Sequence, residues 1–364
     1  MTQEKKLIVV VGATGNQGGS VARRFLQDSR YAVRGLTRNT SSPASQALAA
    51  QGAEMVTAEL DDPKTLDAAF AEANIIFSVT QYWEPFFRPD CRAKAQELDV
   101  TCRRYAYDVE YRQGKNIADA AAKVVDTLED NGFLVSTLSH ARKCSGGKYT
   151  DLYHFDSKAD IFPDYVRENY PALAAKMSCV QTGYFMTSHA ILPNSYFQKQ
   201  ADGSFHMRLP CSPNTLVPHL DVNGDTGNFV YAVHQMPPGK NYMAMGSHAT
   251  WPEYLQAWAK AVGLPAEKAV YVQVSVDDMI ADTADRDTGV EVAMMFAYSD
   301  DPGYGGGMDL VTAEDMRKET TTCQTRISSF EHSVALNASS RQLTLPVHRC
   351  SNAEGDDVLK HPSP

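Results

Sequence analysis

The stretch VVVGATGNQGGSVARRFL at residues 9–26 runs from a β-branched segment through three glycines into a helical pattern. The glycines recur with the spacing G-x-x-G-x-x-G. Gly12 allows a tight turn, Gly15 lets the backbone approach a ligand, and Gly18 lets a helix pack closely on the preceding strand. A strand, a glycine turn and a helix in this order predict a dinucleotide-binding site. The alternative is a structural turn in a sheet protein that binds no ligand.

The start of the predicted helix makes this turn suitable for binding an anion. The first N–H groups of a helix have no partner within it, and the helix dipole places positive charge at the same end. The turn therefore suits the pyrophosphate of a dinucleotide. We expect the cofactor to contact these residues of the turn: Gly12, Thr14, Gly15, Asn16, Gln17 and Gly18.

The first 190 residues alternate short apolar runs with helical patterns. The runs are rich in Val and Ile and lack polar alternation, as do strands of a parallel sheet that is covered on both faces. The repeated strand–helix order predicts an α/β fold with a Rossmann-type, doubly wound parallel sheet. The expected strands are residues 6–12, 31–37, 53–59, 74–80, 132–139 and 177–185, and the expected helices are 16–29, 42–51, 63–73 and 111–130.

The composition divides the chain into three parts. Residues 1–190 are the expected NAD(P)-binding Rossmann core. Residues 191–318 are irregular and Pro-rich at first, and we expect a smaller α+β region that completes the cleft on the substrate side and interleaves with the core. Residues 319–364 are polar and weakly periodic, which predicts a poorly ordered tail with at most a short helix at 327–336.

Helix signals are clear in the second part. In TWPEYLQAWAKAVGL, Thr250 is the expected N-cap and Pro252 falls in the first turn. The segments 275–300 and 311–318 predict further helices.

The bulk composition excludes several classes of function. The net charge of −10 disfavours non-specific binding to nucleic acid or to an anionic membrane. No apolar run approaches the roughly 20 residues of a membrane span, and the first residues predict a buried strand and not a signal peptide. The seven cysteines lack CxxC or Cys/His ligand spacing, and no other cluster predicts a metal site. We expect a soluble, cytoplasmic protein with reduced thiols.

The end of the second predicted strand bears on the choice of cofactor. Sites for NAD(H) usually place an acid about 20 residues after the glycines, where it binds the ribose 2′-hydroxyl. Here Arg38 occupies that place, followed by Asn39. An arginine can bind a 2′-phosphate through charge-assisted hydrogen bonds. The sequence therefore predicts NADP(H), although Arg38 could also be a solvated surface residue.

Two further strand ends carry polar or aromatic side chains. Asp61 and Asp62 lie where polar groups would surround the adenine of a dinucleotide. They could also cap the helix that starts at Pro63, and the two roles can coexist. Thr80, Gln81 and Tyr82, with an aromatic run after them, would line the ribose–nicotinamide side, because ligands bind at the carboxyl ends of strands in such sheets. The aromatic cluster could also belong to the core.

The segment LYHFDSKADI at residues 152–161 contains a tyrosine and a lysine that could form a catalytic pair. Short-chain reductases use Tyr-x-x-x-Lys on a helix, where residues four apart lie roughly 40° apart around the axis. Tyr153 and Lys158 are five apart, or roughly 140°, so they cannot both face one site. The residue four before the lysine is His154. We expect Lys158 to bind the nicotinamide ribose and His154 to exchange the proton, or else to be a helix-face residue bonded to a backbone carbonyl. Tyr153 is then a packing or entrance residue.

Several of these motifs together resemble the NmrA-like family, an atypical branch of the extended short-chain dehydrogenase/reductase superfamily. The resemblance covers about residues 5–318. Two segments depart from it, namely an insertion at residues 87–110 and the tail after Lys318. The motifs that carry it are GATGNQGGSVARRFL, LTRN, FSVTQYWE, QGKNIADAA, YHFDSKADI and TGYFMTSH.

The resemblance implies a Rossmann core, NADP binding and a small C-terminal region on the substrate side. In the family, the stretch that TGYFMTSH resembles borders the nicotinamide, which makes Gly183, Tyr184 and Phe185 candidate cofactor contacts, unless the two aromatic residues are core. Gln113 opens the helix after the insertion and is a further candidate, although polarity at a helix start explains it as well.

Two functions agree with these observations. The first is an NADP(H)-dependent oxidoreductase that acts on a small organic molecule, as in relatives encoded beside fungal secondary-metabolite enzymes. The second is a catalytically silent sensor whose NADP(H) state changes its affinity for a protein partner, in the cytoplasm or the nucleus. The missing tyrosine favours the sensor, whereas the insertion, the aromatic run and the His/Lys pair favour the enzyme. A sugar-nucleotide epimerase is disfavoured, because that chemistry relies on the absent tyrosine.

Overall fold

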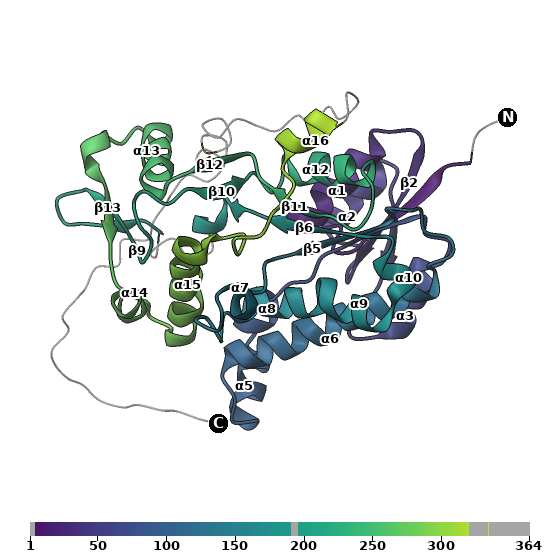
Figure 1. The fold of residues 1–364 in the computed structure, drawn as a ribbon, viewed down its shortest axis with the longest axis horizontal. Helices are drawn as coiled ribbons and strands as arrows, with labels where there is room; N and C mark the ends of the chain where they lie inside the picture. Colours follow the sequence, from purple (N-terminus) through teal and green to yellow (C-terminus); the bar gives the residue numbers. More distant parts are fainter. Residues whose placement is uncertain (1–3, 191–195, 320–333, 335–364) are drawn as a thin grey trace, which may run out of the picture.

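A seven-stranded parallel sheet forms the centre of the molecule (Figure 1). In this computed structural model, the described residues are 4–190, 196–319 and Val334. The strand order is β11-β6-β5-β4-β1-β2-β3, so the chain runs outward from β1 in both directions, as in a doubly wound sheet. The strands are β1 (Lys6–Val10), β2 (Tyr31–Thr37), β3 (Glu54–Thr57), β4 (Ile75–Ser78), β5 (Phe133–Thr137), β6 (Met177–Thr182) and β11 (Asn241–Ala244).

Alternate residues of β1 show why its sequence is apolar throughout. Ile8 and Val10 join the hydrophobic core on one face of the sheet, and Val9 joins the core on the other. Because side chains alternate across a strand, a sheet that is covered on both faces needs apolar residues at every position. The predicted α/β class and parallel sheet are confirmed.

Helices cover both faces of this sheet (Figure 1). One face is covered by α1 (Asn16–Leu26), α2 (Pro43–Ala50), α12 (Thr226–His234) and α16 (Ala313–Glu319). The other is covered by α3 (Pro63–Phe70), α6 (Cys102–Lys123), α9 (Val166–Asn169) and α10 (Pro171–Ala174).

The seventh strand was not predicted from the sequence. β11 pairs in parallel with β6, with Asn241 opposite Cys179, although it lies far beyond the first 190 residues. It has only four residues and directly follows a Pro-Pro-Gly turn, so its strand pattern is weak. α12 also escaped prediction, and it packs against α1. The six predicted strands are present, and all but the second are shorter than expected.

The insertion at residues 87–110 is helical. It begins at the end of α4 (Trp83–Phe87), forms α5 (Pro89–Glu97) and supplies the first turns of α6. The helix predicted at 111–130 therefore starts nine residues earlier and ends at Lys123. α5 lies below α6 at the lower edge of the molecule in Figure 1.

The second part of the chain builds a separate apolar core beside the carboxyl ends of the sheet. Thr250 caps α13 with a reciprocal bond from its backbone N–H to Glu253, which confirms the predicted helix start. The core contains Trp251, Trp258 and Phe296. Its helices are α13 (Trp251–Val262), α14 (Val276–Asp282) and α15 (Arg286–Tyr298), the latter two within the predicted 275–300.

Two small sheets complete this region. One has the order β12-β10-β7 and the other β13-β9-β8. Their strands are β7 (Tyr184–Phe185), β8 (Gln198–Lys199), β9 (Phe205–Leu209), β10 (Val217–Leu220), β12 (Ser247–Ala249) and β13 (Ala269–Gln273).

Short helical elements complete the described chain. They are α7 (Ala141–Cys144), α8 (Tyr153–Ala159), a π-type turn (Asp160–Tyr165), a 3₁₀ turn (Ser188–Ala190), another (Ala266–Lys268) and a second π-type turn (Ser299–Gly303). The predicted tail at residues 319–364, including 327–336, lies outside the described residues except for Glu319, which ends α16, and Val334. Among the described residues, no helix combines the length and apolar character that crossing a bilayer requires.

Candidate functional site

A cavity of about 610 Å³ opens at the carboxyl ends of the parallel strands. Residues that immediately follow strands line it, such as Val11 after β1, Val79 after β4 and Leu138 after β5. Open α/β sheets bind ligands at this edge, where the chain switches direction outward from β1. With one exception, every predicted site residue lines this single cavity, including His154 and Lys158. The exception is Asp62.

The glycine turn closes one side of the cavity with no room for side chains. Gly12 has a φ of +63°, a conformation that glycine adopts without strain. A Cβ on Gly18 would lie 2.3 Å from the carbonyl oxygen of Gly12. The N–H of Gly15 donates to that same oxygen at 2.9 Å, which fixes the turn at the start of α1. Gly12 and Gly18 therefore have the structural roles that the sequence predicts, and the contact of Gly15 with a ligand stays a prediction.

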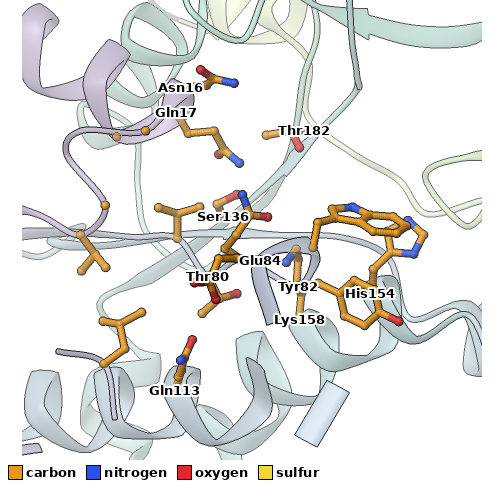
Figure 2. Close-up of a pocket in the computed structure, with 18 of the residues that line it drawn as sticks. Asn16, Gln17, Thr80, Tyr82, Glu84, Gln113, Ser136, His154, Lys158 and Thr182 are labelled. Carbon is orange, nitrogen blue, oxygen red and sulfur yellow. The ribbon is translucent and has the colours of Figure 1, made fainter. Parts of the chain in front are cut away.

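Two buried polar atoms on the cavity wall have no hydrogen-bond partner within the described part of the chain. They are Oε1 of Gln17, on α1, and Oγ1 of Thr80, after β4. Burial of a polar atom without a partner costs free energy, so such atoms mark where a polar ligand binds. Figure 2 shows Gln17 and Thr80 on facing sides of the cavity, with Lys158 and Gln113 nearby. The turn, the helix N-terminus and these two atoms fit a dinucleotide.

Arg38 lies where the 2′-phosphate end of a dinucleotide is expected. Its guanidinium donates to Oε1 of Glu84 at 2.8 Å, and its side chain is 63% exposed. Arg88 contacts the same carboxylate at 3.5 Å. Two arginines therefore flank one carboxylate at this end of the cavity, and both line it. Exposed ion pairs of this kind are weak, so a phosphate can compete for Arg38.

The two acids after β3 have different roles. Asp61 lines the cavity and accepts hydrogen bonds from Arg112 at 2.7 Å and from the amide of Gln113 at 2.9 Å. Asp62 lies outside the cavity wall and caps α3, because its Oδ1 accepts the backbone N–H of Lys64 at 3.1 Å. Asp62 therefore has the predicted capping role, while its contact with the adenine stays an untested prediction for a residue outside the cavity wall.

Lys158 is held by a buried acid from α6. Its ammonium group forms an ion pair with Glu110, whose side chain is fully buried. Ser157 donates a hydrogen bond to the same carboxylate. Tyr153 lies apart from the cavity wall, where it packs against Tyr107 and donates a hydrogen bond to Asp151. Tyr153 is therefore a packing residue.

His154 is held by a second buried acid, from α15. Its Nδ1 lies 2.6 Å from Oε1 of Glu291, and its backbone N–H donates to the same oxygen at 2.8 Å. Arg103, from the insertion, donates to the other carboxylate oxygen at 2.8 Å. Glu291 is completely buried, which by itself would raise its pKa, but the hydrogen bonds and charges of His154 and Arg103 hold that pKa below the usual value. The alternative of a histidine bonded to a backbone carbonyl is therefore not what the structure contains.

Aromatic rings surround the end of the cavity near His154. Tyr82 and Trp83 lie with ring centroids 5.7 and 5.1 Å from the imidazole. The hydroxyl of Tyr82 donates to the carbonyl of Arg103 at 3.1 Å, and that of Tyr184 lies 2.8 Å from Oγ of Ser299. Burial raises the pKa of both tyrosines well above its ordinary value, so neither is an acid or base near neutral pH. Tyr184 packs in the core, as the alternative interpretation of the sequence expects, and it also lines the cavity, so its contact with the cofactor stays a prediction.

Sequence reasoning missed the acids that hold the His/Lys pair. Glu110 and Arg103 belong to the insertion. From the sequence, the insertion was interpreted as an added segment, and its residues were not predicted to contact the site. Glu291 is the only acid in the apolar run TGVEVAMMF, and an isolated acid in such a run was an available signal. The second part of the chain also contributes lining residues that were not predicted, namely Tyr196, Val292, Met295 and Tyr304.

The profile of the NmrA-like family matches residues 4–329. The chain belongs to the NmrA-like family. An NmrA-like family domain-containing oxidoreductase of Aspergillus versicolor is 39% identical over 278 residues, which are 72% of this chain and 70% of that protein. Another, of Aspergillus campestris, is 28% identical over 276 residues, or 71% and 74% of the two chains.

The fold is also that of solved NmrA structures. NmrA, a negative transcriptional regulator, superimposes with a TM-score of 0.65 in its complex with NAD, at 19% identity, covering 92% of this chain and 95% of NmrA. Its complex with NADP gives a TM-score of 0.63 at 18% identity, with the same coverage. At this level of identity the likeness is one of fold.

Proposed function

We propose that this protein is an NADP(H)-dependent oxidoreductase that acts on a small organic molecule. The observation that carries the proposal is the shared cavity, in which a dinucleotide turn and an aromatic end lie together with Lys158 and His154. In Figure 2, Asn16 and Gln17 lie at one end, Gln113 at the other, and Lys158 between them with Tyr82 and His154 beside it. A bound nicotinamide would supply or accept the hydride, which the side chains of the chain cannot do.

The residues of the chain have separable tasks in this proposal. Lys158, oriented by Glu110, binds a ribose hydroxyl and brings positive charge beside the reacting atoms. His154 exchanges the proton that accompanies hydride transfer. The rings of Tyr82 and Trp83 hold an apolar substrate and limit the access of water.

The choice of NADP(H) over NAD(H) rests on Arg38. A phosphate at this position would share or replace the Glu84 carboxylate as the partner of the guanidinium. Arg88, on the other side of Glu84, would add a second positive charge. The related NmrA binds both NAD and NADP in solved structures, so the family fold by itself does not select one of them.

We place the proposed reaction in fungal secondary metabolism, as the family resemblance implies. The chain is similar to several proteins named oxidoreductases, from Aspergillus, Cladobotryum and Penicillium. An aromatic-walled cavity suits the apolar ring systems that such pathways produce.

A catalytically silent, NADP(H)-sensing regulator that binds a protein partner is the second candidate. The observation that favours it is the Lys158–Glu110 ion pair, because a lysine neutralised by a buried acid is less available to a substrate. The absence of the reductase tyrosine acts in the same direction.

Consumption of NADPH with apolar ketones, imines and enones separates the two candidates. The proposed enzyme oxidises NADPH with at least one of these classes, and His154→Ala and Lys158→Ala reduce the rate. NADPH that binds tightly but is never consumed overturns the proposal. A partner protein whose capture depends on NADP(H) then supports the regulator.

A further inference from the structure

Three side chains from distant parts of the sequence meet beneath the aromatic end of the cavity. Arg103 comes from the insertion, His154 from α8 and Glu291 from α15. Their exposures are 7%, 5% and 0%. Charged groups are rarely buried this deeply unless they are fully paired, and a carboxylate that is sealed from water in this way usually has a specific role.

The hydrogen bonds around Glu291 fix which imidazole nitrogen carries a proton. Both carboxylate oxygens accept, one from Arg103 and the other from the backbone N–H of His154. Arginine and a backbone N–H can only donate, so they stabilise Glu291 as a carboxylate. The imidazole Nδ1, 2.6 Å from the carboxylate, must then be the protonated nitrogen. Nε2 is consequently the atom that exchanges protons.

Nε2 lies against a residue of the cavity wall. Its neighbour there is Sδ of Met295, at 3.3 Å, and both residues line the cavity wall. A thioether is a weak hydrogen-bond acceptor, so the heteroatom of a substrate competes easily for the same nitrogen. Methionine is also flexible and can make room for a ligand.

We propose that Glu291, fixed by Arg103, is the positioning residue that makes His154 the proton donor to the C=O or C=N heteroatom of an apolar, ring-containing substrate. The inference rests on the proposed function, because it assigns the proton path and the substrate class of the same cavity. In this proposal the insertion at residues 87–110 supplies Arg103, which forms an ion pair with Glu291.

The chemical step balances without a further reactant. A bound dihydronicotinamide would supply the hydride that forms the new C–H bond on the substrate carbon, and the π electrons of the substrate pass to the heteroatom. The heteroatom forms its bond to hydrogen with the proton of Nε2. The nicotinamide is oxidised, the substrate is reduced, and His154 is left neutral until water returns a proton. Glu291 keeps its negative charge throughout and stabilises the imidazolium, as the carboxylate does in other Asp/Glu–His pairs.

Kinetics of Glu291→Gln test this role, with the isosteric amide chosen to keep the packing. We expect kcat to fall by about 100-fold with little change in KM, since the interaction acts on proton transfer and not on binding. Arg103→Lys should retain part of the activity.

The matched control is Arg92→Gln. Arg92 also joins the insertion to α15, through an ion pair with Asp285 at 2.7 Å, but it does not reach His154. This variant should keep the wild-type kcat. If Glu291→Gln remains within about three-fold of wild type in kcat, or if its loss of activity lies in KM and not in kcat, the proposal is wrong.

A readout independent of activity uses the wild-type protein. Nitrogen-15 NMR of the imidazoles, with the His154 signals identified by their loss in His154→Gln, reports the tautomer directly. We expect Nδ1 of His154 to stay protonated when the ring is neutral, and an Nε2–H tautomer overturns the proposal. If wild type consumes no NADPH at all, the proposed function fails, while this tautomer still decides whether Glu291 sets the state of His154.

Discussion

The two ends of the cavity are built in different ways. The dinucleotide end comes from one continuous stretch, in which Gly12, Gly15 and Gly18 lie within seven residues. The proton-transfer end comes from Arg103, His154 and Glu291, which are separated by up to 188 residues along the chain. A local motif fixes the cofactor site, whereas the fold of the whole chain assembles the chemistry beside it. The cofactor can therefore be retained while the reaction changes, and variants at the two ends should have separable effects.

The largest expected effect is at the glycine turn. Gly18→Val should abolish measurable NADPH binding and destabilise the protein by roughly 2–4 kcal/mol, because its Cβ would lie 2.3 Å from a backbone oxygen. Isothermal titration and thermal unfolding measure the two quantities. Gly19→Ala is the milder control, since the side chain nearest to its new Cβ is the movable end of Arg23, at 3.1 Å. Equal NADPH affinity in Gly18→Val and wild type would show that the turn does not hold the cofactor.

The next prediction concerns His154 and separates catalysis at one end of the cavity from cofactor binding at the other. His154→Ala should lower kcat by about 10²–10⁴-fold and leave the Kd for NADPH within about three-fold of wild type. Steady-state kinetics and a fluorescence titration with NADPH provide the two values. Tyr153→Phe, one residue away but outside the cavity wall, should change neither. A loss of NADPH binding that matches the loss of activity would mean that the ends are not independent.

A smaller effect concerns cofactor choice at the dinucleotide end. Arg38→Gln should weaken NADPH binding by about ten-fold, equivalent to about 1.4 kcal/mol, and leave NADH binding nearly unchanged. NADH serves as the control within the same variant, because it lacks the 2′-phosphate. Direct titration with both nucleotides provides the ratio. A wild-type protein that binds NADH as tightly as NADPH contradicts the role given to Arg38.

The smallest effect tests how α8 is anchored. Nδ1 of His140 lies 2.9 Å from Asp156 on α8, and its Nε2 lies 3.1 Å from Asp160. Burial would lower the pKa of His140, but hydrogen bonds to Asp156 and Asp160 raise it to about 9. A raised pKa stabilises the fold fully below the unfolded value, near 6.5, and that stability is lost as the pH rises through about 9.

The expected loss is on the order of 1 kcal/mol, because the side chain of His140 is 12% exposed and solvent screens its charge only in part. Urea unfolding at pH 6 and at pH 9.5 measures this loss, with His140→Gln as the reference. The variant should show a smaller decrease between the two pH values. An identical decrease in both proteins would show that His140 does not cause the loss of stability at high pH.

The sequence predicts the dinucleotide end of the cavity better than the proton-transfer end. The glycine turn and Arg38 are readable because each role depends on a local pattern of strand, turn and helix. The sequence predicts that Lys158 and His154 lie on the same face of a helix, because helical geometry determines the angle between residues four apart. β11 is not readable, since four residues after a Pro-Pro-Gly turn acquire strand structure only by pairing with β6. The ion pairs of Glu110 and Glu291 are likewise set by the packing of α6 and α15 against α8, which no local window contains.

Deuterium transfer from NADPH labelled at C4 of the nicotinamide tests the central claim most directly. The label is followed by mass spectrometry into the products of apolar ketones and imines, with wild type and His154→Ala compared at saturating NADPH. We predict one deuterium on the reduced carbon with wild type, and at least a hundred-fold slower transfer with the variant although it still binds NADPH. NADPH that binds to wild type but passes deuterium to no substrate of either class would contradict the account.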